Sequence, residues 1–405
     1  MTYHPHHDLL QWIDEQQQPM LDQVIEWSNI NTYTFNLLGL KILSKKISKA
    51  LTILGEEVYE IELPSFCYVD NSGNHRELPL APLLMIQKRP HASRQCLLVI
   101  HMDTAYPPQE SLQEAFLIEG RILHGQGVSD AKGGIVVLVK SLEAFEKSDV
   151  SDRMGWKIII TTDREIGSPC SKKILTEIAK QYDLGFIFEP CLPDGGLIGS
   201  RKGAGYFAIV ARAQNTSNSI ECRTMPNAID AIAGCVSRIH AINGTREGLS
   251  INLGLIYGGK TIDQVPDSAV IRFEIKLSNS QDIPFVEDQI NMVVRETAKE
   301  KNLSLSLWGG FSLPPKPLNE ATLRLLHHIQ KCGEELNLHL DWRDSNRVCD
   351  GNILNAVGLP TVDTLGVQGG KIHSPEEYMY IESLKERTKL TTLALLKWAE
   401  GSWDI

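Results

Sequence analysis

Short apolar segments alternate with amphipathic helical segments along most of this chain, and that alternation limits the fold more than any other feature. The apolar segments at 96–103, 156–163 and 184–190 are separated by helix-like segments at 133–147 and 171–182. Such alternation indicates parallel strands that are joined by crossover helices. The strands are almost continuously apolar, which is typical of strands buried on both faces. We therefore expect a layered α/β sandwich.

The pattern changes within residues 203–313. Here the predicted order is strand, helix, strand, strand, helix, strand, which is the βαββαβ order of ferredoxin-like domains. The proline-rich segment at 311–319 is typical of a hinge, and strand–helix alternation resumes after it. The simplest interpretation is an insertion: residues 203–313 form a small domain inside a larger α/β domain made of residues 1–202 and 314–405.

Composition narrows the class of protein. The 405 residues carry a formal net charge of −10, whereas nucleic-acid binders usually present a basic face. No uninterrupted apolar stretch approaches the ~18 residues of a membrane span, and the N-terminus lacks the apolar segment of a secretory signal. The eight cysteines form no CxxC pair, which indicates free thiols in a reducing compartment. We expect a cytoplasmic protein that binds neither nucleic acid nor a membrane.

Polar residues with metal-binding side chains gather at the predicted strand ends, where open α/β sheets bind their ligands. The strand ends and adjoining loops carry His101, Asp103, Asp130, Asp163, Arg164, Glu165, Glu189 and His373. Imidazoles and carboxylates suit zinc, and a carboxylate shared between two half-sites suits a two-metal hydrolytic centre. Asp103 stands two residues after His101, and we expect its carboxylate to accept the second ring N–H of that histidine.

Several segments, in order along the chain, are similar to those of the co-catalytic zinc metallopeptidases. They are HMDT (101–104), HGQGVSDAKGG (124–134), TDREIGS (162–168), FEP (188–190), DGN (350–352) and GGKIHSPEEY (369–378). That family includes carboxypeptidase G, aminoacylase, acetylornithine deacetylase and succinyl-diaminopimelate desuccinylase. The carboxypeptidase G branch resembles the chain most, because Glu189 stands within FEP. The resemblance implies a three-layer α/β/α catalytic domain with an inserted ferredoxin-like (βαββαβ) lid or dimerisation domain.

The resemblance also implies a set of zinc ligands. It places His101, Asp130 and Glu189 on one zinc ion. It places Glu165, His373 and the shared Asp130 on a second ion. The implied cofactor is therefore zinc, at up to two ions per chain.

Further positions are implied for catalysis and for substrate. Asp103 belongs to the implied catalytic centre, and the implied substrate-binding positions are Asn215, Lys276, Asp350 and Gly370. The family acts on small molecules or peptides that carry an amide bond next to a terminal carboxylate. The resemblance points to the inserted domain as the surface of a homodimer, while the residues themselves leave the oligomeric state open.

One position departs from the family pattern at the centre of the implied site. The family carries its general base as a glutamate directly before the ligand glutamate, whereas the sequence DRE places Arg164 there. Arginine does not accept a proton near neutral pH, and loss of a positioned base typically costs about 10²–10⁴-fold in rate. Three arrangements stay open. Arg164 pairs with Asp163 or Asp350, it lowers the metal occupancy, or it binds an anionic ligand through its guanidinium.

The sequence therefore leaves two functions open. The first is a zinc-dependent hydrolase of the carboxypeptidase or amidohydrolase type, with Asp163 or a chain of waters as its base. The second is a catalytically weak or inactive relative that binds an anionic ligand between its two domains. Metal content and hydrolytic turnover distinguish the two.

Overall fold

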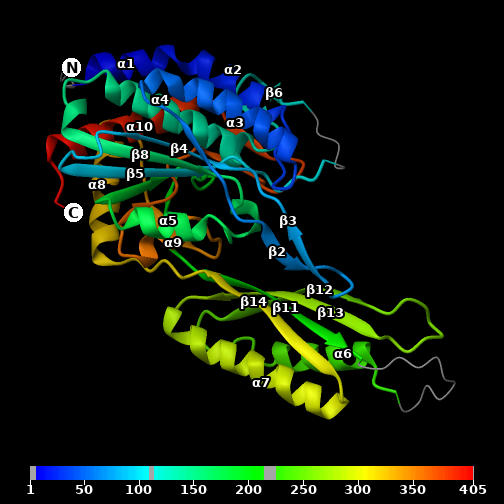
Figure 1. Ribbon diagram of the computed structural model, residues 1–405. Helices are drawn as coiled ribbons and strands as arrows, with labels where there is room; N and C mark the ends of the chain where they lie inside the picture. The colour runs from blue at the N-terminus through cyan, green and yellow to red at the C-terminus, as the bar shows by residue number, and fades with distance from the viewer. Residues whose placement is uncertain (1–5, 109–113, 214–224, 405) are drawn as a thin grey trace.

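The computed structural model describes residues 6–108, 114–213 and 225–404, which form a larger and a smaller part (Figure 1). A six-stranded sheet in the order β1-β4-β8-β5-β9-β16 lies at the centre of the larger part. Its strands are β1 (Tyr59–Ile61), β4 (Leu83–Lys88), β5 (Arg94–His101), β8 (Met154–Thr161), β9 (Leu184–Ile187) and β16 (Thr361–Val362). Almost every residue of β5, β8 and β9 is buried, as expected for strands that are covered on both faces.

Helices cover both faces of this sheet. On one side of the sheet lie α1 (His7–Glu15), α2 (Gln17–Ser28), α3 (Leu37–Leu51), α4 (Gly134–Glu146), α8 (Glu320–Glu335) and α10 (Glu382–Glu400), with α1 packed on other helices. On the other side lie α5 (Lys172–Ala179) and α9 (Gly351–Ala356). Alternate residues of β5 enter the two cores. Leu98 and Ile100 join the first core, and Leu97 and Val99 join the second. The predicted α/β/α sandwich is confirmed.

The strand directions change at one edge of the sheet. Strands β8, β5, β9 and β16 are parallel, but β4 runs antiparallel to β8, and β1 runs antiparallel to β4. The expectation of parallel strands therefore holds for β5, β8 and β9, whereas β4 runs opposite to its neighbours on both sides. The link between β4 and β5, residues 89–93, is too short for the crossover that a parallel pair needs, so the two strands run in opposite directions on either side of β8.

Smaller sheets complete the larger part. Two of them have the orders β17-β18-β7-β6 and β10-β15. Their strands are β6 (Phe116–Ile118), β7 (Ile122–His124), β10 (Leu197–Arg201), β15 (Trp342–Ser345), β17 (Gly369–Gly370) and β18 (Tyr378–Tyr380). A third is a hairpin of β2 (Phe66–Val69) and β3 (His75–Leu78), which the sequence did not predict. This hairpin leaves the larger part and reaches the sheet of the smaller part (Figure 1).

The smaller part has the predicted βαββαβ order and a core of its own. Its elements are β11 (Gly203–Arg212), α6 (Ala228–His240), β12 (Ser250–Gly258), β13 (Ser268–Leu277), α7 (Ile283–Lys301) and β14 (Ser304–Leu313). The strands pair antiparallel in the order β12-β13-β11-β14, and both helices pack on one face of the sheet (Figure 1). Strand β14 includes the beginning of the segment predicted as a hinge. The division of the chain into domains at 203–313 stays a prediction.

The two crossings between the parts meet at a buried ion cluster. Arg201 ends β10 directly before β11, and Lys316 lies just after β14. The backbone N–H of each donates to the carbonyl oxygen of the other at 2.9 Å. The carboxylate of Asp363 accepts hydrogen bonds from Arg201 Nε at 2.8 Å and from Lys316 Nζ at 2.9 Å. All three side chains are buried, so Asp363 holds both crossings against the larger part.

Within the described ranges, no helix combines the length and the apolar composition that crossing a membrane requires.

Candidate metal centre

The carboxyl ends of the central strands bring the candidate ligands together. His101 is the last residue of β5, Glu165 lies in the short turn Arg164–Ile166 after β8, and Glu189 follows β9. Because β5, β8 and β9 are parallel neighbours, these ends meet at one edge of the sheet. Asp130 comes from the turn before α4, and His373 comes from the loop between β17 and β18.

The carboxylate of Asp130 lies between the two histidines. Its Oδ1 is 3.1 Å from His101 Nε2, and its Oδ2 is 3.3 Å from His373 Nε2. Glu165 Oε2 lies 3.1 Å from His373 Nε2, and Glu189 Oε1 lies 3.8 Å from His101 Nε2. One imidazole and one further carboxylate therefore flank Asp130 on each side, which is the geometry of two half-sites that share a carboxylate.

The buried polar atoms of this cluster test whether it fits a cation. Glu165 Oε1 is buried and has no hydrogen-bond partner among the described residues. One ligand atom each from His101, Asp130 and Glu165 lie within 4.8 Å of one another. A buried carboxylate oxygen without a partner is costly, and a bound cation would satisfy it. The imidazole and carboxylate donors are ones that zinc accepts, so the residues fit a divalent cation.

The charges of both histidines depend on the carboxylates around them. Burial would lower the pKa of His101, but its hydrogen bonds to Asp103 and Asp130 raise that pKa well above its usual value. Hydrogen bonds to Asp130 and Glu165 raise the pKa of His373 to about 10. Because a metal ligand must be a neutral imidazole, metal binding at this cluster releases protons.

Asp103 positions its neighbours in two ways. Nδ1 of His101 lies 2.9 Å from the backbone carbonyl oxygen of Asp103 and 3.4 Å from its carboxylate, so the expected carboxylate contact is present but the carbonyl is the nearer acceptor. The carboxylate of Asp103 also accepts hydrogen bonds from the Thr34 hydroxyl at 2.7 Å and from the backbone N–H of Glu165 at 3.0 Å. Asp103 therefore orients two candidate ligands, His101 through a contact to its ring and Glu165 through a hydrogen bond to its backbone.

The side chain of Arg164 lies against the cluster and is 15% exposed. Its Nε is 3.3 Å from Oε1 of Glu189, and one of its terminal nitrogens donates to the carbonyl oxygen of Val348. Burial would lower the pKa of Arg164, but the negative charge of Glu189 and its neighbours raises it well above its usual value. The guanidinium thus carries its charge and neutralises a candidate ligand.

Among the described residues, Arg164 forms no ion pair with Asp163 or Asp350, so the first of the three open arrangements is not the one observed. Oδ2 of Asp163 accepts the backbone N–H groups of Cys170 and Ser171, each at 2.9 Å, and burial raises the pKa of Asp163 to about 6. The carboxylate of Asp350 accepts the hydroxyls of Thr161 and Ser168. Asp163 is fully buried and faces the start of α5, so it is poorly placed to act as the base that the sequence suggested.

The three predicted substrate positions that the structure describes, Lys276, Gly370 and Asp350, lie on different elements. Lys276 lies on β13 of the smaller part, with its Nζ 3.4 Å from Glu274. Gly370 is on β17, where an added Cβ would lie 3.0 Å from the Tyr378 hydroxyl, and Asp350 is at the N-cap position of α9 without a side-chain capping bond. Asn215 is outside the described residues. The substrate roles of all four residues stay predictions.

Glu377 holds the Asp130 loop, and the sequence analysis did not assign it a role. Its buried carboxylate accepts the backbone N–H groups of Gly127, Ser129 and Asp130 at 2.9–3.0 Å, and it also accepts the hydroxyl of Tyr106. The signal was present in the sequence, because Glu377 belongs to the same motif as His373.

Replacing Glu377 is expected to weaken metal binding. We expect Glu377→Gln to lower metal affinity about 10–100-fold. An amide offers one acceptor oxygen where the carboxylate offers two, so the variant would hold the loop that carries Asp130 less well. Calorimetric titration with zinc measures the change. Glu376→Gln is the matched control, since Glu376 is exposed and, among the described residues, has hydrogen bonds to Ser374 alone. Equal zinc affinity in the two variants would contradict the role given to Glu377.

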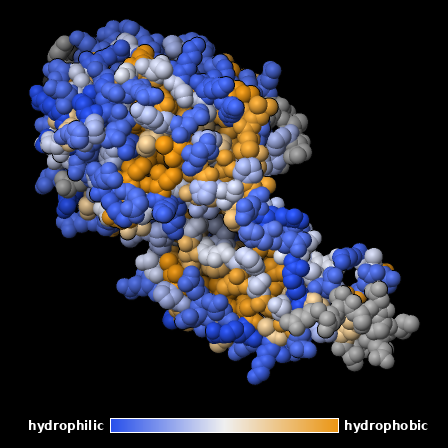
Figure 2. Space-filling view, in the orientation of Figure 1, coloured by the Kyte–Doolittle hydropathy of each residue, from blue (hydrophilic) through white to orange (hydrophobic). Residues whose placement is uncertain are grey.

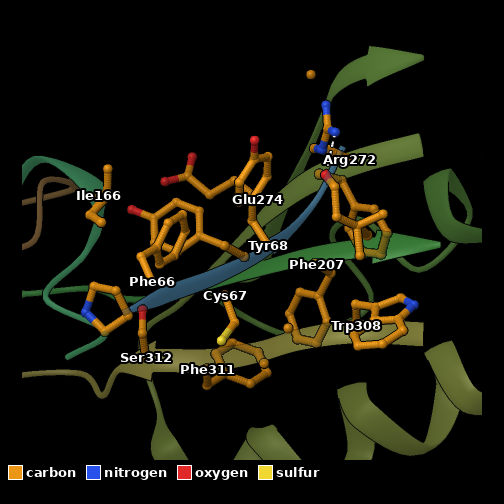
Figure 3. Close-up of a pocket in the computed structure, with 18 of the residues that line it drawn as sticks. Phe66, Cys67, Tyr68, Ile166, Phe207, Arg272, Glu274, Trp308, Phe311 and Ser312 are labelled. Carbon is orange, nitrogen blue, oxygen red and sulfur yellow. Dashed lines mark hydrogen bonds between the residues drawn. The ribbon is translucent and has the colours of Figure 1, made fainter. Parts of the chain in front are cut away.

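A cavity of about 750 Å³ lies between the β2–β3 hairpin and the sheet of the smaller part (Figure 3). Its aromatic lining includes Phe66, Tyr68, Tyr206, Phe207, Trp308 and Phe311. Ile166 and Pro169 also line it, and they follow Glu165 in the chain, so the cavity lies beside the candidate metal centre. Figure 2 shows hydrophobic surface on both parts, on either side of the narrower region that joins them.

The chain combines an α/β/α sandwich, an inserted βαββαβ unit, and imidazoles and carboxylates at the strand ends. This combination is typical of the class of metallopeptidases and related hydrolases. The chain belongs to peptidase family M20/M25/M40, whose sequence profile matches residues 97–397.

Individual relatives support this assignment over nearly the whole chain. Carboxypeptidase G2 of Pseudomonas sp. (strain RS-16) is 21% identical over 402 residues, which cover 97% of this chain and 92% of that protein. The structure of Sso-CP2, an M20 family metallo-carboxypeptidase of Sulfolobus solfataricus, matches with a TM-score of 0.74 at 15% identity and covers 94% of this chain and 99% of that one. The YXEP protein of Bacillus subtilis, described as a dinuclear metal binding peptidase, matches with a TM-score of 0.63 at 13% identity, with coverages of 95% and 98%. The two structural matches show the shared fold.

Proposed function

We propose that this protein is a metal-dependent hydrolase of amide or peptide bonds next to a terminal carboxylate, similar in substrate class to carboxypeptidase G. The observation that carries the proposal is the position of Asp130, whose two carboxylate oxygens lie 3.1 and 3.3 Å from His101 and His373. A carboxylate shared in this way is the central feature of two-metal hydrolytic sites, where the metal polarises the substrate carbonyl and activates water. Zinc is the proposed metal, at up to two ions per chain.

Each residue of the cluster has a proposed task. His101 and Glu189 would hold one ion and Glu165 and His373 the other, with Asp130 between them. Asp103 would orient His101 and the turn that carries Glu165, as its hydrogen bonds indicate.

The smaller part has a proposed task as well. It would supply substrate contacts through Asn215 and Lys276 and form the surface of a homodimer. Strand β12 supports the dimer proposal, because it lies at an edge of its sheet and exposes Leu255 and Ile256. We propose a cytoplasmic location.

We further propose that turnover is slow. The base position holds Arg164, and the other acids near it are engaged: Asp163 by backbone N–H groups and Asp350 by hydroxyls. Absence of a positioned general base reduces the rate about 10²–10⁴-fold.

The contact between Arg164 and Glu189 favours a second candidate function, an anionic-ligand-binding protein without turnover. A guanidinium about 5 Å from a doubly charged ion in the His101 and Glu189 half-site would oppose its binding by roughly 7 kcal/mol at an effective dielectric near 20. That half-site would then bind metal weakly, and the guanidinium would be available to a carboxylate ligand.

Metal content and turnover together decide between the candidates. We expect protein purified without chelator to contain zinc by elemental analysis and to hydrolyse N-acyl amino acids or dipeptides slowly, and we expect chelation to abolish that hydrolysis. His373→Ala is the matched control, because it removes one ligand of the cluster and should remove the activity. Zinc below one ion per chain and no hydrolysis, with calorimetric binding of an N-acyl amino acid, would instead establish the binding protein.

A further inference from the structure

We propose that the β2–β3 hairpin carries a second metal site, for zinc, formed by Cys67, His75 and Glu77. The site lies outside the strand-end cluster and is independent of the function proposed for that cluster.

The register of the hairpin places the three side chains together. Cys67 pairs directly with Glu77 across the two antiparallel strands. His75 lies two residues before Glu77 on β3, so the alternation of a strand places both on the same face. One ligand atom from each of the three residues lies within 4.8 Å of the other two.

The donor set is one that zinc prefers. A thiolate, an imidazole and a carboxylate are its three common protein ligands, and ligand distances of about 2.0–2.3 Å in a tetrahedral site place the donors roughly 3.5 Å apart. All three side chains are exposed, so small rotamer changes suffice to close the remaining distance and an ion reaches them from solvent. Three protein ligands leave a fourth position for water or for a further donor.

The hairpin that carries these residues is held firmly against the sheet of the smaller part. Arg272 donates to Asn71 Oδ1 at 2.8 Å and to the carbonyl oxygen of Val69, and Arg212 donates to the carbonyl oxygen of Gly73 at 2.6 Å. These bonds hold the turn between the two strands and so preserve the register that aligns the ligands.

Ring and hydroxyl contacts add to this attachment. The ring of His75 packs against Trp308 of β14 with 5.7 Å between centroids, and Ser268 of β13 donates to the carbonyl oxygen of Ser72 at 2.9 Å. One of the three ligands is therefore already oriented, which lowers the cost of ordering the site on binding.

The proposed site lies at the wall of the cavity between the two parts. Cys67 and His75 both line this cavity, and Figure 3 shows the Cys67 side chain directed toward Phe311 of β14. An ion bound here would cross-link β2 to β3 and stiffen the only described hairpin that bridges from the larger part to the sheet of the smaller part.

Cobalt(II) is a probe that separates this site from the strand-end cluster. A thiolate bound to cobalt gives a charge-transfer absorption band, whereas the candidate ligands of the strand-end cluster include no cysteine. We expect the protein, kept reduced with a phosphine, to develop this band on titration with cobalt(II) and to saturate at one thiolate-bound ion per chain. Absence of the band at millimolar cobalt would overturn the proposal.

Substitutions then identify the ligands. We expect Cys67→Ser to abolish the band, and His75→Ala and Glu77→Gln each to lower cobalt affinity at least tenfold. Cys170→Ser is the matched control: Cys67 and Cys170 both place their sulfur atoms within 3.9 Å of the Ser65 carbonyl oxygen, but Cys170 is outside the cluster. A band that is lost in Cys170→Ser, or that is unchanged in His75→Ala, would contradict the assignment.

One further variant keeps the two metal proposals distinct. His101→Ala removes a ligand of the strand-end cluster and should leave the band and its midpoint unchanged. If the band weakens in His101→Ala but not in Cys67→Ser, the proposal of a metal site on the hairpin is wrong. That conclusion does not depend on whether the protein hydrolyses a substrate.

Discussion

Arg164→Glu is expected to raise the rate of hydrolysis of an N-acyl amino acid by about 10²–10⁴-fold. The substitution places a carboxylate in the base position of the family. It also removes the guanidinium that lies 3.3 Å from Glu189, and so frees that candidate ligand. The measurement is kcat/KM for the zinc-loaded protein, together with zinc stoichiometry by elemental analysis.

Arg164→Gln is the control that separates these two effects. It removes the positive charge without supplying a base, so we expect tighter zinc binding and little gain in rate. If Arg164→Glu binds two zinc ions and hydrolyses no faster than the unaltered protein, the base is not what limits turnover. The implied substrate-binding positions in the smaller part, Asn215 and Lys276, would then be the next to test.

Asp363→Asn is expected to lower the free energy of unfolding by about 3–5 kcal/mol, because it leaves Arg201 and Lys316 buried without a counter-charge. Chemical denaturation at pH 7 measures the loss. Glu320→Gln is the matched control: it breaks the exposed pair with Arg324 and should change stability by no more than about 0.5 kcal/mol. A loss below about 1 kcal/mol for Asp363→Asn would show that the cluster does not hold the two crossings.

The same cluster predicts a dependence on pH. Burial would raise the pKa of Asp363, but Arg201 and Lys316 hold it well below its usual value. A lowered pKa in the folded state means that the carboxylate stabilises fully above the unfolded pKa of about 4, and that this stabilisation is lost as the pH falls below it. The stability difference between the protein and Asp363→Asn should therefore be constant from pH 7 to about pH 5 and shrink below pH 4.

Most elements and the candidate ligands could be predicted because their signals are local. The apolar segment of β5 is too short for a typical helix and therefore predicts a buried strand, which places its last residue, His101, at the ligand-binding edge of the sheet. The βαββαβ order of the smaller part follows in the same way from alternating periodicities.

The β2–β3 hairpin could not be predicted because its partner is distant in the chain. Its strands are only four residues long and largely exposed, so they give a weak periodic signal. What holds them is Arg272 and Arg212, about 140 to 200 residues further on, and no local pattern records such contacts.

Two other features also depend on contacts between distant segments. They are the orientation of β4 and the cluster of Arg201, Lys316 and Asp363. A strand's direction is set by the length of the link that follows it and by the neighbour it pairs with. A buried charge is placed by partners from other segments, here from β10, from the chain after β14 and from the chain after β16.

By itself, the sequence determined which side chains stand at the strand ends and that an arginine, Arg164, directly precedes the candidate ligand Glu165. Only the tertiary structure decided where that arginine points. Asp163 and Asp350 are held by backbone N–H groups and by hydroxyls, so the guanidinium of Arg164 turns to Glu189 and to the carbonyl oxygen of Val348. The physical reason is that a buried charge needs an opposite charge within reach, and which acid lies within reach is decided by residues far apart in the chain.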